Sequence, residues 1–348
     1  MSPSDLVPAI LASEPRSVAR ALRLVDDRVP GHLEMLKELW AHTGKAWVLG
    51  VTGNPGAGKS TLVDRLIEAY RAQGQRVAVV AVDPTSPYSG GAILGDRIRM
   101  ARHTMDDGVF IRSLATRGHL GGLSGSARDV VRVLDAAGYG VVIVETVGVG
   151  QDELEITHTA STTLVVMAPG LGDEVQAIKA GILECADVLV VNKADRDGAD
   201  ATVRDLELMI ALGNESILAL SRSRGHATHT RADAYVGPPS TPPSGLTAGR
   251  WTPPIVKSVS TRGEGIADLV ASLDRHRAWA EGTDAGRARR ASRLSEEVRE
   301  ALREALIGAA VHDLRAQIDR AVHDVDARRI DPYTATERLV GAFRERAR

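Results

Sequence analysis

A glycine-rich run that ends in Lys59 and Ser60 carries the clearest chemistry in this sequence. Residues 50–61 read GVTGNPGAGKST and match the spacing G-x-x-x-x-G-K-[ST]. Glycines at this spacing let the backbone curl until several N–H groups converge on one anion, at a helix start whose dipole adds positive potential. The lysine would bridge the β- and γ-phosphates of a nucleotide, and the serine hydroxyl would ligate Mg²⁺. The residues expected to hold the nucleotide here are Gly53, Asn54, Pro55, Gly56, Ala57, Gly58, Lys59, Ser60 and Thr61.

A second motif, NKAD at residues 192–195, is typical of a loop that selects a base. A carboxylate in a base pocket accepts hydrogen bonds from both the ring N–H and the exocyclic amine of guanine, a donor pair that adenine lacks. We therefore expect Asp195 to select guanine, Asn192 to tie the base loop to the phosphate loop, and the stem of Lys193 to cover the base. Alone, these four residues would more often be a polar turn. Their place after an apolar run, downstream of a phosphate loop, favours GTP.

The run VVIVETVGVG at 141–150 contains an acid and a glycine at the spacing of D-x-x-G, a motif common in GTPases. Glu145 is the acid that would orient the Mg²⁺ shell, and the N–H of Gly148 would sense the γ-phosphate. Val149 follows, where a water-orienting glutamine often stands, and valine cannot hydrogen-bond an attacking water. We therefore expect slow hydrolysis by the isolated protein, with Gln151 two positions away or a partner completing the site.

Two further acids are candidates for the metal or for the attacking water. Asp83 ends the apolar run in AVVAVDPTS, and Asp96 lies in GGAILGDRIRM. Each could equally be a helix cap or a turn residue, but the two nucleotide motifs favour the metal role. The expected metal ligands are Ser60, Asp83, Asp96 and Glu145.

The elements that must position these residues follow from apolar runs between 46 and 275. Seven runs are strand-like: AWVLGV, RVAVVAVD, VFIRSL, GVVIVET, TTLVVMAP, VLVVNK and PIVKSV. Continuous Val-rich runs indicate strands covered on both faces, and helix-like stretches separate most of them. The pattern predicts an α/β fold with a doubly wound, mostly parallel sheet.

Both flanks of this region are predicted to be helical, at residues 4–41 and 286–326, with a turn and a closing helix at 331–343. Residues 221–254 are rich in Pro, Ser, Thr and Gly and indicate an irregular surface excursion. In the second helical region an apolar residue recurs every four positions, which favours either packing on its own domain or pairing with a second copy of the chain. This stripe consists of Leu294, Val298, Leu302, Leu306, Ala310, Leu314, Ile318 and Val322.

Composition excludes several classes of protein. The formal net charge of −2 gives no basic field for a nucleic-acid partner, and one cysteine, Cys185, cannot form an internal disulfide. No apolar run approaches the length of a membrane span, and the N-terminus lacks a signal-peptide core. We expect a cytoplasmic protein with neither a membrane nor a nucleic acid as partner.

Several longer motifs together resemble the methylmalonyl-CoA mutase-associated GTPases, the MeaB/ArgK family of P-loop GTPases. They are VDPTS, GDRIRM, TRGHLGGLS, ETVGVGQDE, GLGDEVQAIKAGILECADVLVVNKAD, WTPPI and DPYTATERL. The resemblance covers nearly the whole chain and is least distinctive at 221–250. It implies a homodimeric GTPase chaperone that gates adenosylcobalamin loading and protects a cobalamin-dependent acyl-CoA mutase. It also implies three parts: an N-terminal helical extension at 1–44, a P-loop GTPase domain at 45–280 and a C-terminal helical dimerisation arm at 281–348.

By matching motif positions, the resemblance also implies roles for individual residues. Asp83, Asp96 and Glu145 would surround Mg²⁺ and the hydrolytic water. Residues 173–179 would be the segment called switch III, which includes Asp173, Gln176 and Lys179. Lys179 could supply the charge stabilisation that Val149 cannot, once the partner orders the loop. The expected catalytic residues are then Lys59, Asp83, Glu145 and Lys179.

The chain departs from the family pattern at the guanine-capping segment, which usually reads S-A-x-x-G-x-G. Val259 and Ser260 stand at the first two positions, aligned on Gly263 and Gly265. The contact to guanine O6 is largely a backbone N–H, so we expect binding at Ser258, Val259 and Ser260 to survive.

Two other functions remain open from the residues. A metal-inserting maturation GTPase would need a His- or Cys-rich cluster, and here only HATH at 226–229 brings two histidines close together. A scaffold that binds GTP without functional turnover would keep the phosphate loop but need no activation.

Overall fold

The structure is a computed structural model that describes residues 2–84, 101–103, 105–116, 122–146, 156, 159–170, 185–223 and 250–346. The chain divides into two compact units, Met1–Arg289 and Arg290–Arg348, and the boundary falls within one long helix. Seven residues to which the sequence assigns a role lie outside the described residues: Asp96, Gly148, Val149, Gln151, Asp173, Gln176 and Lys179.

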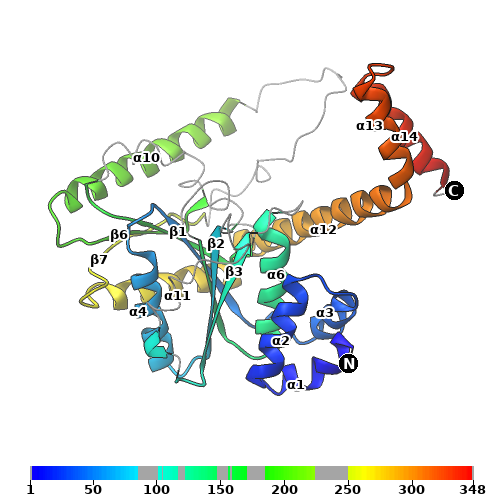
Figure 1. Cartoon of the computed structure of the whole chain (residues 1–348). Helices are drawn as coiled ribbons and strands as arrows, with labels where there is room; N and C mark the ends of the chain where they lie inside the picture. The colour runs from blue at the N-terminus through cyan, green and yellow to red at the C-terminus, as the bar shows by residue number, and fades with distance from the viewer. Residues whose placement is uncertain are drawn as a thin grey trace. The chain divides into compact units, whose positions relative to one another are not determined.

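The first unit is built on a seven-stranded sheet in the order β3-β2-β4-β1-β5-β6-β7, and every pairing in it is parallel (Figure 1). Its strands are β1 (Trp47–Gly53), β2 (Val77–Pro84), β3 (Val109–Thr116), β4 (Val141–Thr146), β5 (Thr162–Met167), β6 (Val188–Asn192) and β7 (Ile255–Ser258). They correspond to the seven apolar runs, so the predicted doubly wound α/β fold is confirmed.

Both faces of the sheet are buried, because neighbouring strand residues enter different hydrophobic clusters. In β2, Val77 and Val79 pack in a cluster with α4 (Lys59–Ala72) and α11 (Ile266–Gly282), whereas Ala78 and Val80 pack in one with α6 (Gly122–Ala136). Figure 1 shows α4 and α6 on opposite sides of the sheet. Burial of both faces explains why the strands are continuous Val-rich runs rather than alternating ones. A third cluster packs α10 (Ala199–Ser223) against β5 and β6.

The N-terminal residues form the short 3₁₀ helix η1 (Pro3–Leu6) and the helices α1 (Val7–Leu11), α2 (Pro15–Asp26) and α3 (His32–Trp40). The predicted helical character of residues 4–41 is therefore confirmed. Leu22, Val25, Leu36 and Leu39 share one hydrophobic cluster with α6, whereas Leu33 is 53 % exposed. These helices are part of the layer that covers one face of the sheet.

A buried polar cluster lies at the amino end of β6, at Asp187. Arg289 on α12 (Asp284–Asp313) donates to both carboxylate oxygens, at 2.9 Å for Nη2 to Oδ2, and the Thr163 amide donates to Oδ2 at 2.8 Å. His276 Nε2 lies 3.3 Å from Oδ1. Burial alone would raise the pKa of Asp187, but His276 and the Arg289 guanidinium hold that pKa below its usual value.

Aromatic rings close this cluster. The rings of Trp47, Trp251 and Trp279 lie 6.3, 4.9 and 5.4 Å from the ring of the fully buried His276, between centroids. Trp251 also donates its indole N–H to the Asp187 carbonyl at 2.7 Å. The start of α12 is therefore fixed to the sheet by the Asp187–Arg289 pair, beside an aromatic box that Trp47, Trp251 and Trp279 form around His276.

The second unit continues α12 and adds α13 (Arg315–Asp326) and α14 (Pro332–Arg346). The single helix expected over 286–326 is wrong in one respect, because the chain breaks between α12 and α13 at the buried Leu314. The predicted start of the last helix at Asp331-Pro332 is confirmed. The Asp331 carboxylate caps it by accepting from the amides of Tyr333 and Thr334, both at 2.9 Å.

Candidate functional site

The candidate site lies at the carboxyl edge of the sheet, where β1, β2, β4, β6 and β7 all end. In doubly wound sheets this edge is where ligands bind, since the loops after neighbouring strands meet there. The motifs predicted from the sequence fall on these loops: GAGKS follows β1, Glu145 lies near the end of β4, and NKAD begins at the last residue of β6.

The curl of the phosphate loop between β1 and α4 requires glycine at two of its positions. Gly53 has φ +130°, and a Cβ there would lie 2.0 Å from the Val166 carbonyl oxygen. Gly58 has φ +91° and precedes the first residue of α4, where a Cβ would lie 2.5 Å from Asn192 Nδ2. Both positions combine a left-handed backbone with close approach of a neighbouring strand or loop.

Lys59 begins α4 and extends its side chain back into the loop. Its Nζ donates to the Gly53 carbonyl at 2.7 Å and to the Asn54 carbonyl at 3.1 Å, and the residue is only 7 % exposed. The ammonium group thus lies inside the curl of backbone, at the amino end of a 14-residue helix. That combination of a buried cation and a helix dipole suits a chain of phosphates.

Ser60 and Glu145, two of the expected metal ligands, are brought together. The Ser60 hydroxyl donates to Glu145 Oε1 at 2.7 Å, and both residues are buried. A hydroxyl beside a carboxylate is an all-oxygen donor set of the kind that Mg²⁺ prefers, so these two residues fit the ion. Asp83 lies on β2, two residues beyond the partner of Glu145 in the β2–β4 register, Ala81. The structure does not describe the side chain of Asp83.

Asn192 joins three loops of the site. Its Nδ2 donates to the Ala57 carbonyl in the phosphate loop at 2.8 Å, which is the tie expected from the sequence. Its Oδ1 accepts from the Ser260 hydroxyl at 2.8 Å, the Ser260 amide at 3.1 Å and the Ser258 hydroxyl at 3.2 Å. Asn192 is 2 % exposed, so removing it would leave several buried polar groups without this partner.

The rest of NKAD lies at the rim of the site. Lys193 has φ +56° and donates from Nζ to the Gly56 carbonyl at 2.6 Å, so its stem runs back over the phosphate loop. Asp195 has a side chain that is 39 % exposed and lies 3.7 Å from Arg262 Nη2. The carboxylate is therefore accessible to solvent, with the exposed Arg262 as a distant neighbour.

One residue with a defined place at the site was missed by sequence reasoning. Arg65 lies on α4 and contacts the loop after β7, where Ser258, Val259 and Ser260 were expected to cap guanine. In the sequence it is one more arginine on an amphipathic helix, and nothing in its spacing distinguishes it. Across the described residues no group of three or more His, Cys, Asp and Glu could hold a metal ion, and no helix is long and apolar enough to cross a membrane.

Comparisons with known proteins place these features in a family. A family model described as methylmalonyl-CoA mutase-associated GTPase MeaB matches residues 18–314. A Pyrococcus abyssi protein with a provisional GTPase name is 40 % identical over 337 residues, which cover 97 % of this chain and 95 % of that protein. The GTPase ArgK of Escherichia coli is 44 % identical over 188 residues, covering 53 % of this chain and 57 % of ArgK.

A solved structure shares the fold. The crystal structure of a protein named LAO/AO transport system kinase aligns with 98 % of this chain and 97 % of its own, with a TM-score of 0.63 and 23 % identity.

Proposed function

The chain belongs to the methylmalonyl-CoA mutase-associated GTPase (MeaB) family, and from that premise we propose that it gates adenosylcobalamin loading and protects a cobalamin-dependent acyl-CoA mutase. The chain is a P-loop GTPase. The match over residues 18–314 carries the proposal of a mutase as partner. A nematode protein named methylmalonic aciduria type A homolog supports it, because that name refers to methylmalonic acid metabolism. It is 34 % identical over 223 residues, which cover 60 % of this chain and 56 % of that protein.

The site supports GTP as the ligand through Asn192. This side chain holds the phosphate loop and the loop after β7 at fixed positions on either side of β6. A nucleotide whose phosphates lie at Lys59 would then present its base to Asp195, which selects guanine. The proposed binding residues are those of the phosphate loop together with Gly148, Asn192, Lys193, Asp195, Ser258, Val259 and Ser260.

Mg²⁺ would be held by Ser60 and Glu145, with Asp83 and Asp96 completing the set. When bound, the ion would neutralise charge on the phosphates and so assist hydrolysis. The chain's own contribution is to hold the nucleotide, because Val149 offers no hydrogen bond to an attacking water. We therefore propose slow turnover that rises when the mutase engages the segment with Asp173, Gln176 and Lys179.

A homodimer through the C-terminal arm is part of the proposal. Four apolar residues at successive four-residue intervals on α12 are at least 46 % exposed: Leu294, Val298, Leu302 and Leu306. A continuous apolar stripe on a long helix is a typical surface for pairing with a second helix.

The proposed function is tested by GTP turnover of the purified chain, alone and with the adenosylcobalamin-dependent acyl-CoA mutase of the same host. We expect the mutase to raise turnover at least tenfold and the Lys59→Ala variant to lose both turnover and mutase protection. If the mutase left turnover unchanged while Lys59→Ala still protected it, the chain would be a scaffold. Tight, stoichiometric Ni²⁺ or Zn²⁺ binding would instead indicate metal insertion.

A further inference from the structure

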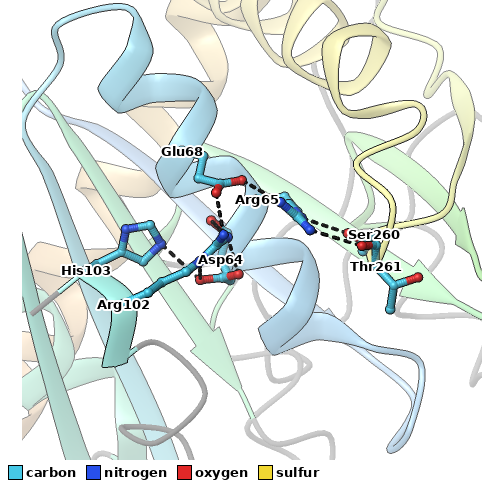
Figure 2. Close-up of polar contacts among 7 residues, drawn as sticks. All are labelled: Asp64, Arg65, Glu68, Arg102, His103, Ser260 and Thr261. Atoms are coloured by element: carbon cyan, nitrogen blue, oxygen red, sulfur yellow. Dashed lines mark hydrogen bonds and ion pairs between the residues drawn. The ribbon is translucent and has the colours of Figure 1, made fainter.

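The outer face of α4 carries a network of ion pairs that ends on the loop after β7 (Figure 2). All nitrogens of the Arg65 guanidinium are engaged in it. Nε donates to the Ser260 carbonyl at 2.9 Å, Nη2 to the Thr261 carbonyl at 3.0 Å, and Nη1 to Glu68 Oε2 at 2.9 Å. Arg65 thus binds two consecutive peptide carbonyls that lie 195 and 196 residues away in the chain.

The loop that Arg65 contacts is held from its other side by the base loop. Ser260 donates its amide and its hydroxyl to Asn192 Oδ1 and accepts Arg65 at its carbonyl. The Val259 amide is engaged by the Glu264 carbonyl at 3.0 Å, which closes the loop into a tight turn. Ser260 is 2 % exposed. The position of this one residue therefore depends on two side chains, one from β6 and one from α4.

We propose that Arg65 is a positioning residue for the base, which holds the loop at Ser260 and Thr261 against the guanine side of the site. This inference rests on the proposed binding of GTP at that loop. Within the part of the chain that the structure describes, the hydrogen bonds of Arg65 reach only α4 and the loop after β7, and none goes to the phosphate loop. Its effect should therefore fall on the base and not on the phosphates.

The contacts of Arg65 depend on the planar shape of its guanidinium group. A planar fork with donors in fixed directions can bind two adjacent carbonyls and a carboxylate at once, whereas the single ammonium of lysine cannot reproduce that arrangement. The ion pair with Glu68 alone, three residues along the helix, would contribute little, because both side chains are partly exposed at 28 and 41 %. The carbonyl contacts are what tie helix to loop.

Glu68 keeps the fork oriented. One of its oxygens accepts from Arg65, and the other accepts from Arg102, which also binds Asp64 through Nε at 2.7 Å. His103 Nε2 lies 2.9 Å from the same Asp64 carboxylate. Although burial acts to raise it, the pKa of Glu68 is held below its usual value by Arg65 and Arg102, so the carboxylate remains ionised across the neutral range. Glu68, itself held by Arg102, therefore fixes the Arg65 guanidinium at Nη1, the nitrogen that does not contact the loop.

The experiment compares Arg65→Ala and Arg65→Lys with the matched control Arg71→Ala. Arg71 lies on the same helix, is equally exposed at 27 %, and forms a two-point ion pair with Asp106 at 2.8 Å, away from the loop. The readouts are the Kd of a fluorescent GDP, its displacement by GDP, ADP and inorganic pyrophosphate, and thermal unfolding. We expect both Arg65 variants to weaken GDP about tenfold and leave pyrophosphate unchanged, with Arg71→Ala changing neither.

Equal losses for GDP and pyrophosphate, or an unchanged GDP affinity in either Arg65 variant, would overturn the proposal. If Arg65→Ala does not fold, Arg65→Lys decides, because it keeps the charge and loses only the fork. A wild-type chain that shows no preference for GDP over ADP would contradict the proposed function instead. The two failures are therefore distinguishable in one set of titrations.

Discussion

Ser260 supplies hydrogen bonds to Asn192 from a position where the family pattern has alanine. The family pattern places serine then alanine where this chain has Val259 and Ser260. In the structure the hydroxyl of Ser260 donates to Asn192 Oδ1 at 2.8 Å, beside the hydroxyl of Ser258 at 3.2 Å. Asn192 therefore accepts hydroxyl donors from the residues on both sides of Val259.

At the residue scale we predict that Asp195→Asn changes the preferred base. The variant replaces an acceptor of two guanine N–H groups by an amide, so GDP affinity should fall about a hundredfold while xanthosine diphosphate gains affinity. Displacement of a fluorescent nucleotide by GDP and by xanthosine diphosphate measures the change. An unaltered preference would remove NKAD from the base pocket.

The sequence indicated the residues of the phosphate and base loops, because each loop is a short contiguous motif that can be recognised without the fold. It could not indicate Arg65, whose importance comes from a contact across 195 residues that no local pattern encodes. The same holds for Asp187, which reads as an ordinary acid before a strand until Arg289 and His276 are placed around it.

At the scale of elements, β6 carries a separate function at each end. Asn192 at its carboxyl end holds the nucleotide loops, and Asp187 just before its amino end holds the start of α12. The strand has only five residues, all buried, and it pairs with β5 on one side and with β7 on the other. The base loop and the start of α12 are therefore attached to one short, buried strand.

We predict that Arg289→Ala makes the chain more sensitive to acid. The folded pKa of Asp187 is lowered, so its pairing stabilises the fold above the ordinary carboxyl pKa and is lost as pH falls through the lower folded pKa. Removing Arg289 should raise that pKa, move acid unfolding to higher pH, and cost about 2 kcal/mol near neutrality.

Denaturant unfolding followed from pH 7 to pH 3 measures both effects. Arg287→Ala is the control, since Arg287 lies two residues away on α12 and pairs only with the exposed Asp284 among its acidic partners in the described structure. Superimposable curves for Arg289→Ala and the wild type would show that Asp187 does not depend on this partner.

The strands were predictable in number and place, since runs such as VVIVET are buried on both faces and need no tertiary information. The break at Leu314 was not predictable from spacing. Leu314 continues the four-residue interval of the stripe, yet it lies between α12 and α13 and is 2 % exposed, while Leu306 is 51 % exposed. An interval of four describes one face of a helix and does not report where that helix ends.

For the whole molecule we predict that the α12 stripe is the surface on which two copies meet. Val298→Asp with Leu302→Asp places charges on residues that are 67 and 57 % exposed, so the folding of the single chain should be unaffected. Light scattering after gel filtration should show the wild type as a dimer and the variant as a monomer at micromolar concentration. A monomeric wild type would contradict the arm as a dimerisation surface.

The aromatic box around His276 also determines what the intrinsic tryptophan fluorescence of this protein reports. Trp47, Trp251 and Trp279 are three of its four tryptophans, and the fourth, Trp40, lies on α3. None of them lies in the phosphate or base loops. Three of the four tryptophans therefore report on the junction between the sheet and α12, and a nucleotide that altered their emission would have acted from the opposite, carboxyl edge of the sheet.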